Sequence, residues 1–429
     1  MTANMPRVSI VDIAPGVTGC HIPSDRFKTT RITLQFLLPL SVDSVSRNAL
    51  LPYILSRACR QYPTMTALNS RLAAIYGASL SAGCAKIGDV QSLTISISTL
   101  DGKFTFDNSD TLSECANLLR DLVFDPLLDG ARFDADLFES EKRLMLERID
   151  GEINDKRKFA LDRAVNIMCD GEPYGTPKYG TRTMTACLTA GDIFTAWRDA
   201  LETAHVRINV IGASCGKIFD QFGKAFSSLS RNVDPGLGAQ QIVKAGIGKN
   251  ITERMAVTQG KLVMGLRSDV TAKDELYVPT VVFCDLFGGS PHSKLFQNVR
   301  ERLSLCYYCA ARYNRAKGII MVDSGITEAN AELARDEIMR QLAATQEGNI
   351  EADELEASKI GIINSALTVL DSPMSLDAWY AERALDPNPL SPEELADKVS
   401  RITKEDVISA ANRFELDTTY LLAPEGESQ

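Results

Sequence analysis

The sequence predicts an α+β protein of two homologous halves, each an α/β sandwich of mainly antiparallel sheet with helices on one face. A repeated segment is the first observation behind this prediction. Thr189 leads an amphipathic stretch that runs into apolar residues 206–212, and Thr403 leads a similar stretch before residues 418–422. The two threonines are 214 residues apart, about half of the 429-residue chain. A duplicated unit is the simplest cause of such a spacing.

The length agrees with a division into two halves, since 429 residues exceed one ordinary domain. The run Asp234-Pro235-Gly236-Leu237-Gly238 interrupts the periodic patterns and is typical of a loop. We therefore predict an N-terminal half over residues 1–226, a linker over 227–249 and a C-terminal half over 250–429.

In the first half, strand-like and helix-like stretches follow one another in blocks. Leu93, Ile95 and Ile97 alternate with threonine and serine, the period of two that indicates a half-buried strand. In chain order we expect a strand over 31–40, helices over 48–60 and 66–76, a strand over 93–98, and helices over 111–122 and 134–169.

The second half repeats this order of elements. In chain order we expect a strand over 261–266, helices over 275–287 and 291–303, strands over 307–313 and 319–322, and helices over 328–346 and 350–370. Strands and helices segregated in this way favour the α+β class with mainly antiparallel sheets.

Charge and composition exclude several classes of partner. The net charge of −10 argues against nucleic acid, and the basic run Lys156-Arg157-Lys158 is typical of the solvated face of a helix. The chain opens without a basic region leading into an apolar stretch, and no segment approaches about 18 uninterrupted apolar residues. We expect a cytoplasmic protein that binds neither membrane nor nucleic acid.

The ten cysteines are scattered through segments predicted to be helices and strands. In a reducing compartment such residues behave as small buried hydrophobes. Cys306 and Cys309 form the single Cys-x-x-Cys, and no second pair of ligands accompanies them. Because side chains three apart on a regular strand point to opposite faces, we expect no joint role for this pair.

One motif in the second half carries a resemblance to a known family. Residues 287–307 read Phe-Gly-Gly-Ser-Pro-His-Ser-Lys-Leu-Phe-Gln-Asn-Val-Arg-Glu-Arg-Leu-Ser-Leu-Cys-Tyr, with Tyr307 seven residues after Arg300. This segment resembles the substrate clamp of the pitrilysin/insulinase zinc metallopeptidases. The resemblance implies two halves closed like a clamshell around a peptide, with Arg300 and Tyr307 holding the substrate. Tyr308 takes the tyrosine role if the alignment moves by one residue.

The zinc motif of that family is missing. Relatives carry His-x-x-Glu-His on the first helix after an early strand, and the alignment places Pro52, Leu55 and Ser56 at the three ligand and base positions. The third ligand, a glutamate in the relatives, falls on Arg148, with Glu147 as the alternative.

Neither residue set suits a divalent cation, because proline and leucine offer no lone pair and an arginine repels the ion. The three histidines, His21, His205 and His292, are too far apart in sequence to share a helix face. We expect no metal and no cofactor.

The resemblance therefore implies a non-catalytic subunit that binds a peptide or an unfolded segment. It would pair with a zinc-bearing insulinase-like paralogue as a heterodimer, a heteromeric peptidase to which it lends Arg300 and Tyr307. The alternative is a stand-alone peptide-binding or scaffold protein. Some bacterial relatives without the zinc motif are associated with modification of a translation elongation factor, which fits either alternative. A peptidase with an unrecognised site is a third hypothesis.

Overall fold

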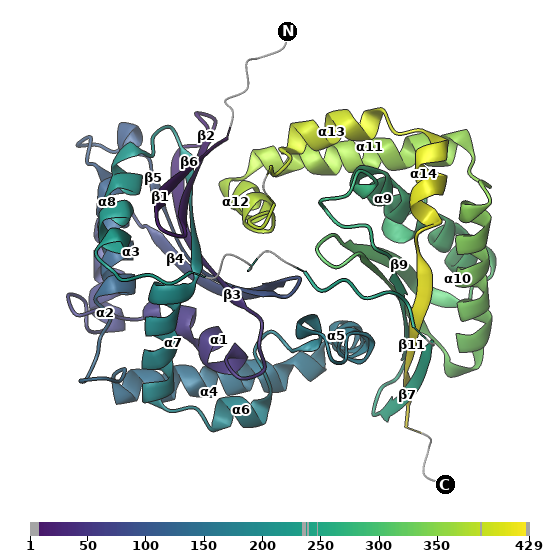
Figure 1. Ribbon diagram of the computed structural model, residues 1–429, viewed down its shortest axis with the longest axis horizontal. Coiled ribbons are helices and arrows are strands. Elements are labelled where there is room, and N and C mark those ends of the chain that lie inside the picture. The colour runs from purple at the N-terminus through teal and green to yellow at the C-terminus, as the bar shows by residue number, and fades with distance from the viewer. Residues whose placement is uncertain (1–7, 234–236, 238–239, 247, 387, 426–429) are drawn as a thin grey trace. The chain divides into compact units, whose positions relative to one another are not determined.

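The computed structural model shows two α/β units, each built around one mainly antiparallel sheet (Figure 1). It describes residues 8–233, 237, 240–246, 248–386 and 388–425. The predicted α+β class with two sheets is confirmed. Within the predicted linker, residues 234–236, 238–239 and 247 lie outside the described residues.

Unit 1 comprises residues 1–150, 176–239 and 370–387. Its sheet has the order β1-β2-β6-β3-β5-β4, in which β2 and β6 are parallel and the other neighbours antiparallel. The strands are β1 Ser9–Ala14, β2 Val17–Pro23, β3 Thr29–Pro39, β4 Ser79–Ile87, β5 Val90–Leu100 and β6 His205–Gly212. The helices are α1 Val45–Leu55, α2 Met65–Ala74, α3 Thr111–Phe124, α4 Ala135–Gly151, α6 Arg182–Ala186, α7 Ala190–Thr203, α8 Gly216–Ser227 and α12 Pro373–Ala381, with the 3₁₀ turns η1 Gly102–Phe104 and η7 Val369–Asp371.

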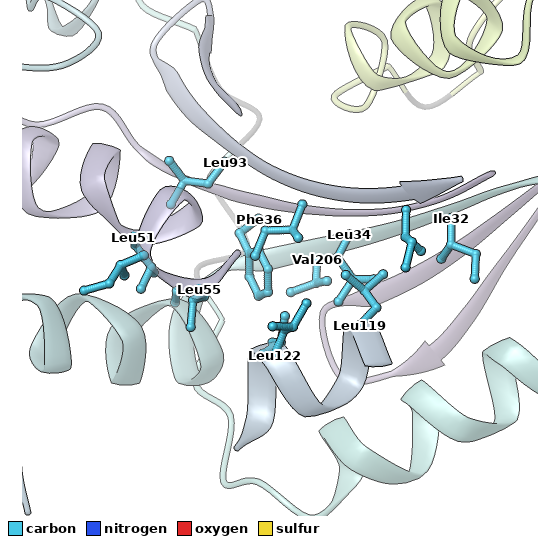
Figure 2. Packing of buried hydrophobic residues seen from close by; sticks show 14 of the residues in the cluster. Ile32, Leu34, Phe36, Leu51, Leu55, Leu93, Leu119, Leu122 and Val206 are labelled. Atoms are coloured by element: carbon cyan, nitrogen blue, oxygen red, sulfur yellow. The ribbon is translucent and has the colours of Figure 1, made fainter. Parts of the chain in front are cut away.

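The core of unit 1 lies between one face of this sheet and the helices α1, α3 and α7. Alternate residues of β3 point to this face, since successive side chains of a strand point to opposite sides. Figure 2 shows the resulting cluster, to which the sheet contributes Ile32, Leu34, Phe36, Leu93 and Val206, and the helices Leu51, Leu55, Leu119 and Leu122. All nine side chains are buried.

Unit 2 comprises residues 151–175, 240–369 and 388–429. Its sheet has the order β7-β11-β8-β10-β9, with β7 and β11 parallel and the other pairs antiparallel. The strands are β7 Lys249–Met255, β8 Gly260–Arg267, β9 Cys306–Asn314, β10 Ile319–Ile326 and β11 Glu415–Pro424. The helices are α5 Lys156–Met168, α9 Tyr277–Cys284, the π-helices η4 Asp285–Gly289 and η5 Phe296–Arg302, α10 Ala331–Gln346, α11 Ala352–Thr368, α13 Pro392–Ser400 and α14 Lys404–Ala411, with the 3₁₀ turns η2 Glu152–Asn154, η3 Pro173–Gly175 and η6 Glu328–Asn330.

The repeat read from the sequence is visible as the same local structure in both units. Thr189 and Thr403 each begin a helix, α7 and α14, with a capping box formed with the aspartate three residues later. Each helix leads into a strand, β6 or β11, that has one parallel and one antiparallel neighbour. From that strand the sheets continue in the matching orders β6-β3-β5-β4 and β11-β8-β10-β9.

The single long helix predicted over residues 134–169 is wrong. The chain leaves α4 at Gly151, makes the turn η2 and starts α5 at Lys156. Asp155 caps the new helix, since its Oδ1 accepts a hydrogen bond of 3.0 Å from the backbone N–H of Lys158. The break is where the chain passes into unit 2.

The two halves of the chain exchange one helix each. α5, from the first half, packs on β8 and β11 of unit 2, whereas α12, from the second half, packs on β3 and β6 of unit 1 (Figure 1). A helix from the opposite half therefore covers the second face of each sheet, the face turned away from the other helices of its own half.

A buried carboxylate anchors α12 to the sheet of unit 1. Asp377 is 4 % exposed, and its oxygens accept hydrogen bonds from Arg31 Nε at 2.7 Å, Thr33 Oγ1 at 2.6 Å and Asn209 Nδ2 at 3.0 Å. The donors lie on β3 and β6. An isolated charge is costly in such a site, whereas three donors on one carboxylate offset its desolvation.

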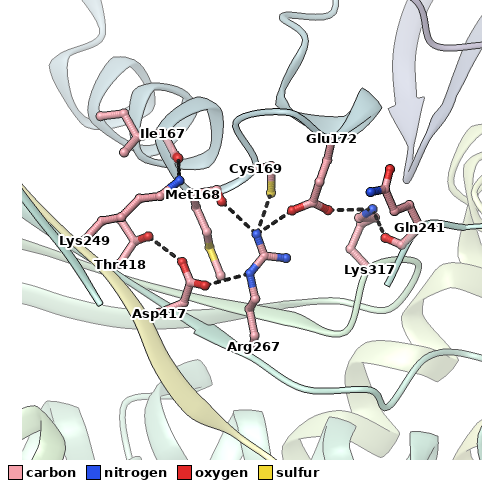
Figure 3. A network of polar contacts seen from close by, with 10 residues as sticks. All are labelled: Ile167, Met168, Cys169, Glu172, Gln241, Lys249, Arg267, Lys317, Asp417 and Thr418. Carbon is pink, nitrogen blue, oxygen red and sulfur yellow. Dashed lines mark hydrogen bonds and ion pairs between the residues drawn. The ribbon is translucent and has the colours of Figure 1, made fainter. Parts of the chain in front are cut away.

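A larger ionic network anchors the segment that contains α5 to unit 2 (Figure 3). Arg267 of β8 donates to Glu172 at 2.5 Å, to Asp417 Oδ2 at 2.9 Å and to the carbonyl oxygen of Met168 at 2.7 Å. Lys317 Nζ lies 3.0 Å from the second oxygen of Glu172. Two cations and two carboxylates thus balance inside a buried site.

Arg157, the middle residue of the predicted solvated run Lys156-Arg157-Lys158, keeps 38 % of its side chain exposed and also contacts the sheet. Arg157 Nη2 donates to Asp323 Oδ1 at 3.2 Å, and Asp323 is buried in β10. The hydrogen bond with Asp323 is the main cause that raises the pKa of Arg157. Arg157 therefore fixes α5 to the sheet while part of its side chain stays in contact with solvent.

We expect Asp377→Ala to lower the free energy of unfolding by about 3–5 kcal/mol, because it leaves Arg31 desolvated without its partner. The matched control is Asp371→Ala, six residues earlier, whose partner Arg26 lies 3.4 Å away on the surface with 58 % of its side chain exposed. That change should cost less than about 1 kcal/mol. Urea unfolding of both variants measures the difference, and equal losses would contradict the anchoring role of Asp377.

Candidate functional site

The positions aligned with the zinc motif hold no metal ligand. Pro52 and Leu55 are buried in α1, and Pro52 also lacks the N–H that a helix interior normally uses. Ser56 follows the helix, and its hydroxyl donates to the carbonyl oxygen of Tyr53 at 2.8 Å. At the positions that the resemblance aligns with the zinc motif, the side chains of Pro52 and Leu55 pack in the interior and that of Ser56 bonds to the backbone.

The third position is occupied by a stacked cation. The guanidinium carbon of Arg148, from α4, lies 4.1 Å from the ring centroid of Tyr53 and 5.8 Å from that of Tyr179. Burial, followed by the neighbouring Tyr179, raises the pKa of Tyr53, so its hydroxyl stays protonated. α1 and α4 thus meet through an arginine–tyrosine stack, a cation–π contact.

The histidines do not supply the missing ligands. His21 lies on β2 with Nε2 2.9 Å from the carbonyl oxygen of Gly212, His205 begins β6, and His292 lies between η4 and η5. Across the described part of the chain, no group of three or more histidine, cysteine, aspartate or glutamate side chains could hold a metal ion. The residues present do not fit the zinc ion that the family resemblance implies.

The predicted clamp residues lie on consecutive elements of unit 2. Arg300 is in η5, where its guanidinium stacks on Phe296 at 4.5 Å and its Nε lies 3.6 Å from a carboxylate oxygen of Glu301. Tyr307 is the second residue of β9 and is 71 % exposed. Both side chains can be reached from solvent, as residues that hold a substrate require.

A glycine fixes where β9 lies against the preceding helix. A Cβ on Gly288, in η4, would come within 2.7 Å of the Cβ of Ala311 on β9. A side chain at this position would force the two elements apart. Gly288, the first glycine of the pair, therefore allows the close approach of η4 and β9.

Tyr308, the alternative to Tyr307, has a different environment. Its ring packs under Arg157 at 4.1 Å and Lys261 at 5.7 Å, and its hydroxyl is buried. Burial, followed by the Asp323 carboxylate, raises its pKa to about 12. A ring held in this way is a packing element, which favours Tyr307 as the residue that would contact a substrate.

The expectation that Cys306 and Cys309 point to opposite faces is wrong. In the pairing of β9 with β10, Ile326 is opposite Cys306 and Gly325 is opposite Tyr308, so Tyr307 is an extra residue. This bulge shifts the alternation of side chains by one position. The two thiols consequently meet on one face and share a hydrogen bond. The Cys-x-x-Cys spacing was the sequence signal for this pair.

No helix in the residues that the structure describes combines the length and the apolar character needed to cross a membrane.

Comparison with known proteins agrees with the geometry of the site. Residues 189–362 match the family model described as Peptidase M16 inactive domain. The chain is 32 % identical over 410 residues to the probable inactive metalloprotease YmfF of Bacillus subtilis, covering 95 % of this chain and 96 % of that protein. It is 22 % identical over 276 residues to the uncharacterized zinc protease YmxG of the same organism, covering 64 % and 66 %. The crystal structure of a conserved protein from Enterococcus faecalis V583 superposes with a TM-score of 0.90 at 26 % identity, covering 98 % of this chain and 100 % of that one.

We expect the purified chain to retain far less than one zinc ion per molecule after incubation with zinc and dialysis, because Pro52, Leu55 and Arg148 replace ligands. Elemental analysis gives the ratio, with a zinc enzyme of known stoichiometry carried through the same dialysis. The variant Arg148→Glu should also retain far less than one zinc ion, because one added carboxylate still leaves the site short of ligands. About one zinc retained by the unmodified chain would contradict this reading of the site.

Proposed function

The chain belongs to the M16 peptidase family, and from this premise we propose that it is a non-catalytic subunit of a heteromeric peptidase. In this proposal it binds a peptide or unfolded segment and pairs with a zinc-bearing paralogue. The partner supplies the metal site, and this chain supplies Arg300 and Tyr307.

The observation that carries the proposal is the stack of Arg148 on Tyr53. It fixes a permanent positive charge, 4.1 Å from the tyrosine ring, at a position where relatives place a zinc ligand. A cation at this position repels a divalent metal ion. Loss of ligands on both α1 and α4, together with this cation, supports a chain that does not depend on metal chemistry of its own.

The side-chain chemistry of Arg300 and Tyr307 supports the proposed role in holding a substrate. Arg300 offers a planar donor fork and Tyr307 a hydroxyl on a stiff ring. In attack on a peptide carbonyl, negative charge grows on the oxygen, and donors already placed there lower the barrier. The exposure of Tyr307, and the packed ring and buried hydroxyl of Tyr308, support this assignment of roles.

The two Bacillus subtilis relatives support the pairing. One organism carries both a probable inactive metalloprotease and a zinc protease that match this chain. A probable inactive metalloprotease and an uncharacterized zinc protease thus belong to one organism, as the proposed pairing requires.

We expect the isolated chain to cleave no unstructured peptide and to co-elute with a zinc-bearing family member from the same genome. An interface of the usual size for a stable complex, about 1,200–2,000 Å², survives gel filtration. Co-expression followed by gel filtration and a fluorogenic peptide assay tests both points. Chelator-sensitive activity of the isolated chain would contradict the non-catalytic assignment.

In the reconstituted pair, Arg300→Ala or Tyr307→Phe should lower turnover by about 10² to 10³, the usual cost of removing one donor from a developing oxyanion. Tyr308→Phe is the matched control, because it removes a buried hydroxyl from the adjacent residue and keeps the packed ring. Gel filtration shows whether each variant still assembles. Unchanged turnover in assembled Arg300 and Tyr307 variants would favour the stand-alone peptide-binding or scaffold function instead.

A further inference from the structure

Cys306 and Cys309 are held together by the irregular start of β9. The extra residue Tyr307 puts both cysteine side chains on the face that looks toward Ser324 of β10, which lies opposite Cys309 in the register. Ser324 is 1 % exposed, and its hydroxyl is near enough to both thiols to lower the pKa of each. The arrangement depends on the pairing of two strands and is therefore a fixed feature of the fold.

The surroundings shift the pKa values of the two thiols in opposite directions. The hydrogen bond from Cys309 is the main cause that lowers the pKa of Cys306 to about 7, with Ser324 and the charge of Arg300 acting in the same direction. The same hydrogen bond, with burial, raises the pKa of Cys309 well above its usual value. Both shifts favour Cys306 as the thiol of the pair that forms the thiolate.

Most other cysteines of the chain are shifted in the opposite direction. Burial is the main cause of the raised pKa in each of Cys20, Cys59, Cys84, Cys115, Cys215 and Cys284. Cys187 is exposed, so it serves as an internal reference for simple access to solvent. Cys306 differs from all of these by having a second thiol as its hydrogen-bond donor.

We propose that Cys306 and Cys309 form a redox-active dithiol that exchanges with low-molecular-weight disulfides, with Cys306 as the attacking thiol and Cys309 as the resolving thiol. Cys306 is the more exposed of the two, at 9 % against 4 %.

The exchange balances in two steps. The Cys306 thiolate attacks one sulfur of the small disulfide, whose S–S bond breaks, and the first small thiolate leaves and takes up a proton. Cys309 then loses its proton and attacks the sulfur of Cys306, which releases the second small thiol. Two protein thiols are oxidised to one disulfide, and one small disulfide is reduced to two thiols.

Closing the bond requires the sulfurs to approach from hydrogen-bond contact to about 2.05 Å and the two Cα atoms to come within about 7 Å. The position of the pair allows this movement. Among the strands that the structure describes, β9 is at the edge of its sheet and pairs with β10 alone. Ser304, two residues before the strand, has a left-handed φ of 49°, so Cys306 follows a turn and is constrained by pairing on one side alone.

The test is titration of the reduced, full-length chain with glutathione disulfide, followed by intact mass and peptide mapping. We expect a product lighter by two hydrogen atoms, with a Cys306–Cys309 disulfide and no retained glutathione on the pair. Cys309→Ser should trap glutathione on Cys306, and Cys306→Ser should abolish reaction at the pair. Cys187→Ser is the control and should leave the internal disulfide unchanged.

A second measurement follows the pH dependence of the reaction. Alkylation of Cys306 by iodoacetamide in the Cys309-containing chain should rise with pH through a midpoint of about 7, because the thiolate is the reactive form. In Cys309→Ser the midpoint should move, since the strongest hydrogen bond to the thiolate changes. Glutathione found only on Cys187, or a mixed disulfide that persists on Cys306 beside an unreacted Cys309, would overturn the proposal.

Discussion

Buried charges paired by residues from opposite halves of the chain are the constraint on which the architecture depends. Arg31 and Asp377 are 346 residues apart in the sequence, and they form an ion pair that is largely shielded from solvent. Arg267 forms a similar buried pair with Glu172, which lies in the same segment of the first half as α5. Because an unpaired buried charge costs several kcal/mol, each sheet is complete only when the helix of the other half is in place. The hydrophobic cores set the two sheets, and these ion pairs decide which helix covers their second faces.

Local signals explain what could be predicted of the fold. The capping boxes at Thr189 and Thr403 and the alternation at Leu93, Ile95 and Ile97 are decided within a few residues, so they could be found in the sequence. The exchange of helices could not be predicted in this way. Periodicity indicates which face of a helix is buried, but it does not identify the element that covers that face. Asp377 has the sequence context of an ordinary surface aspartate, and only the donors on β3 and β6 make it an anchor.

Some features of the candidate site could likewise be predicted from the sequence, whereas others depend on the tertiary structure. The absence of metal ligands at Pro52 and Leu55 and the spacing of Arg300 and Tyr307 are properties of the sequence itself. The stack of Arg148 on Tyr53 depends on two helices meeting. The bulge at Tyr307 depends on the register between β9 and β10. Regular strand geometry without the bulge would place the two cysteines on opposite faces. Register is a tertiary property, and one extra residue reverses every side chain beyond it.

The late position of α12 in the chain bears on the order of events during synthesis. The strands of unit 1 are complete once β6 has been made, but residues 373–381 emerge much later. At about 5–20 residues per second, the delay is on the order of ten seconds or more. During that interval the sheet face that carries Arg31, Thr33 and Asn209 is open to solvent and lacks the carboxylate of Asp377. The sheet of unit 1 therefore completes its contacts only when residues 373–381 have been made, long after its last strand.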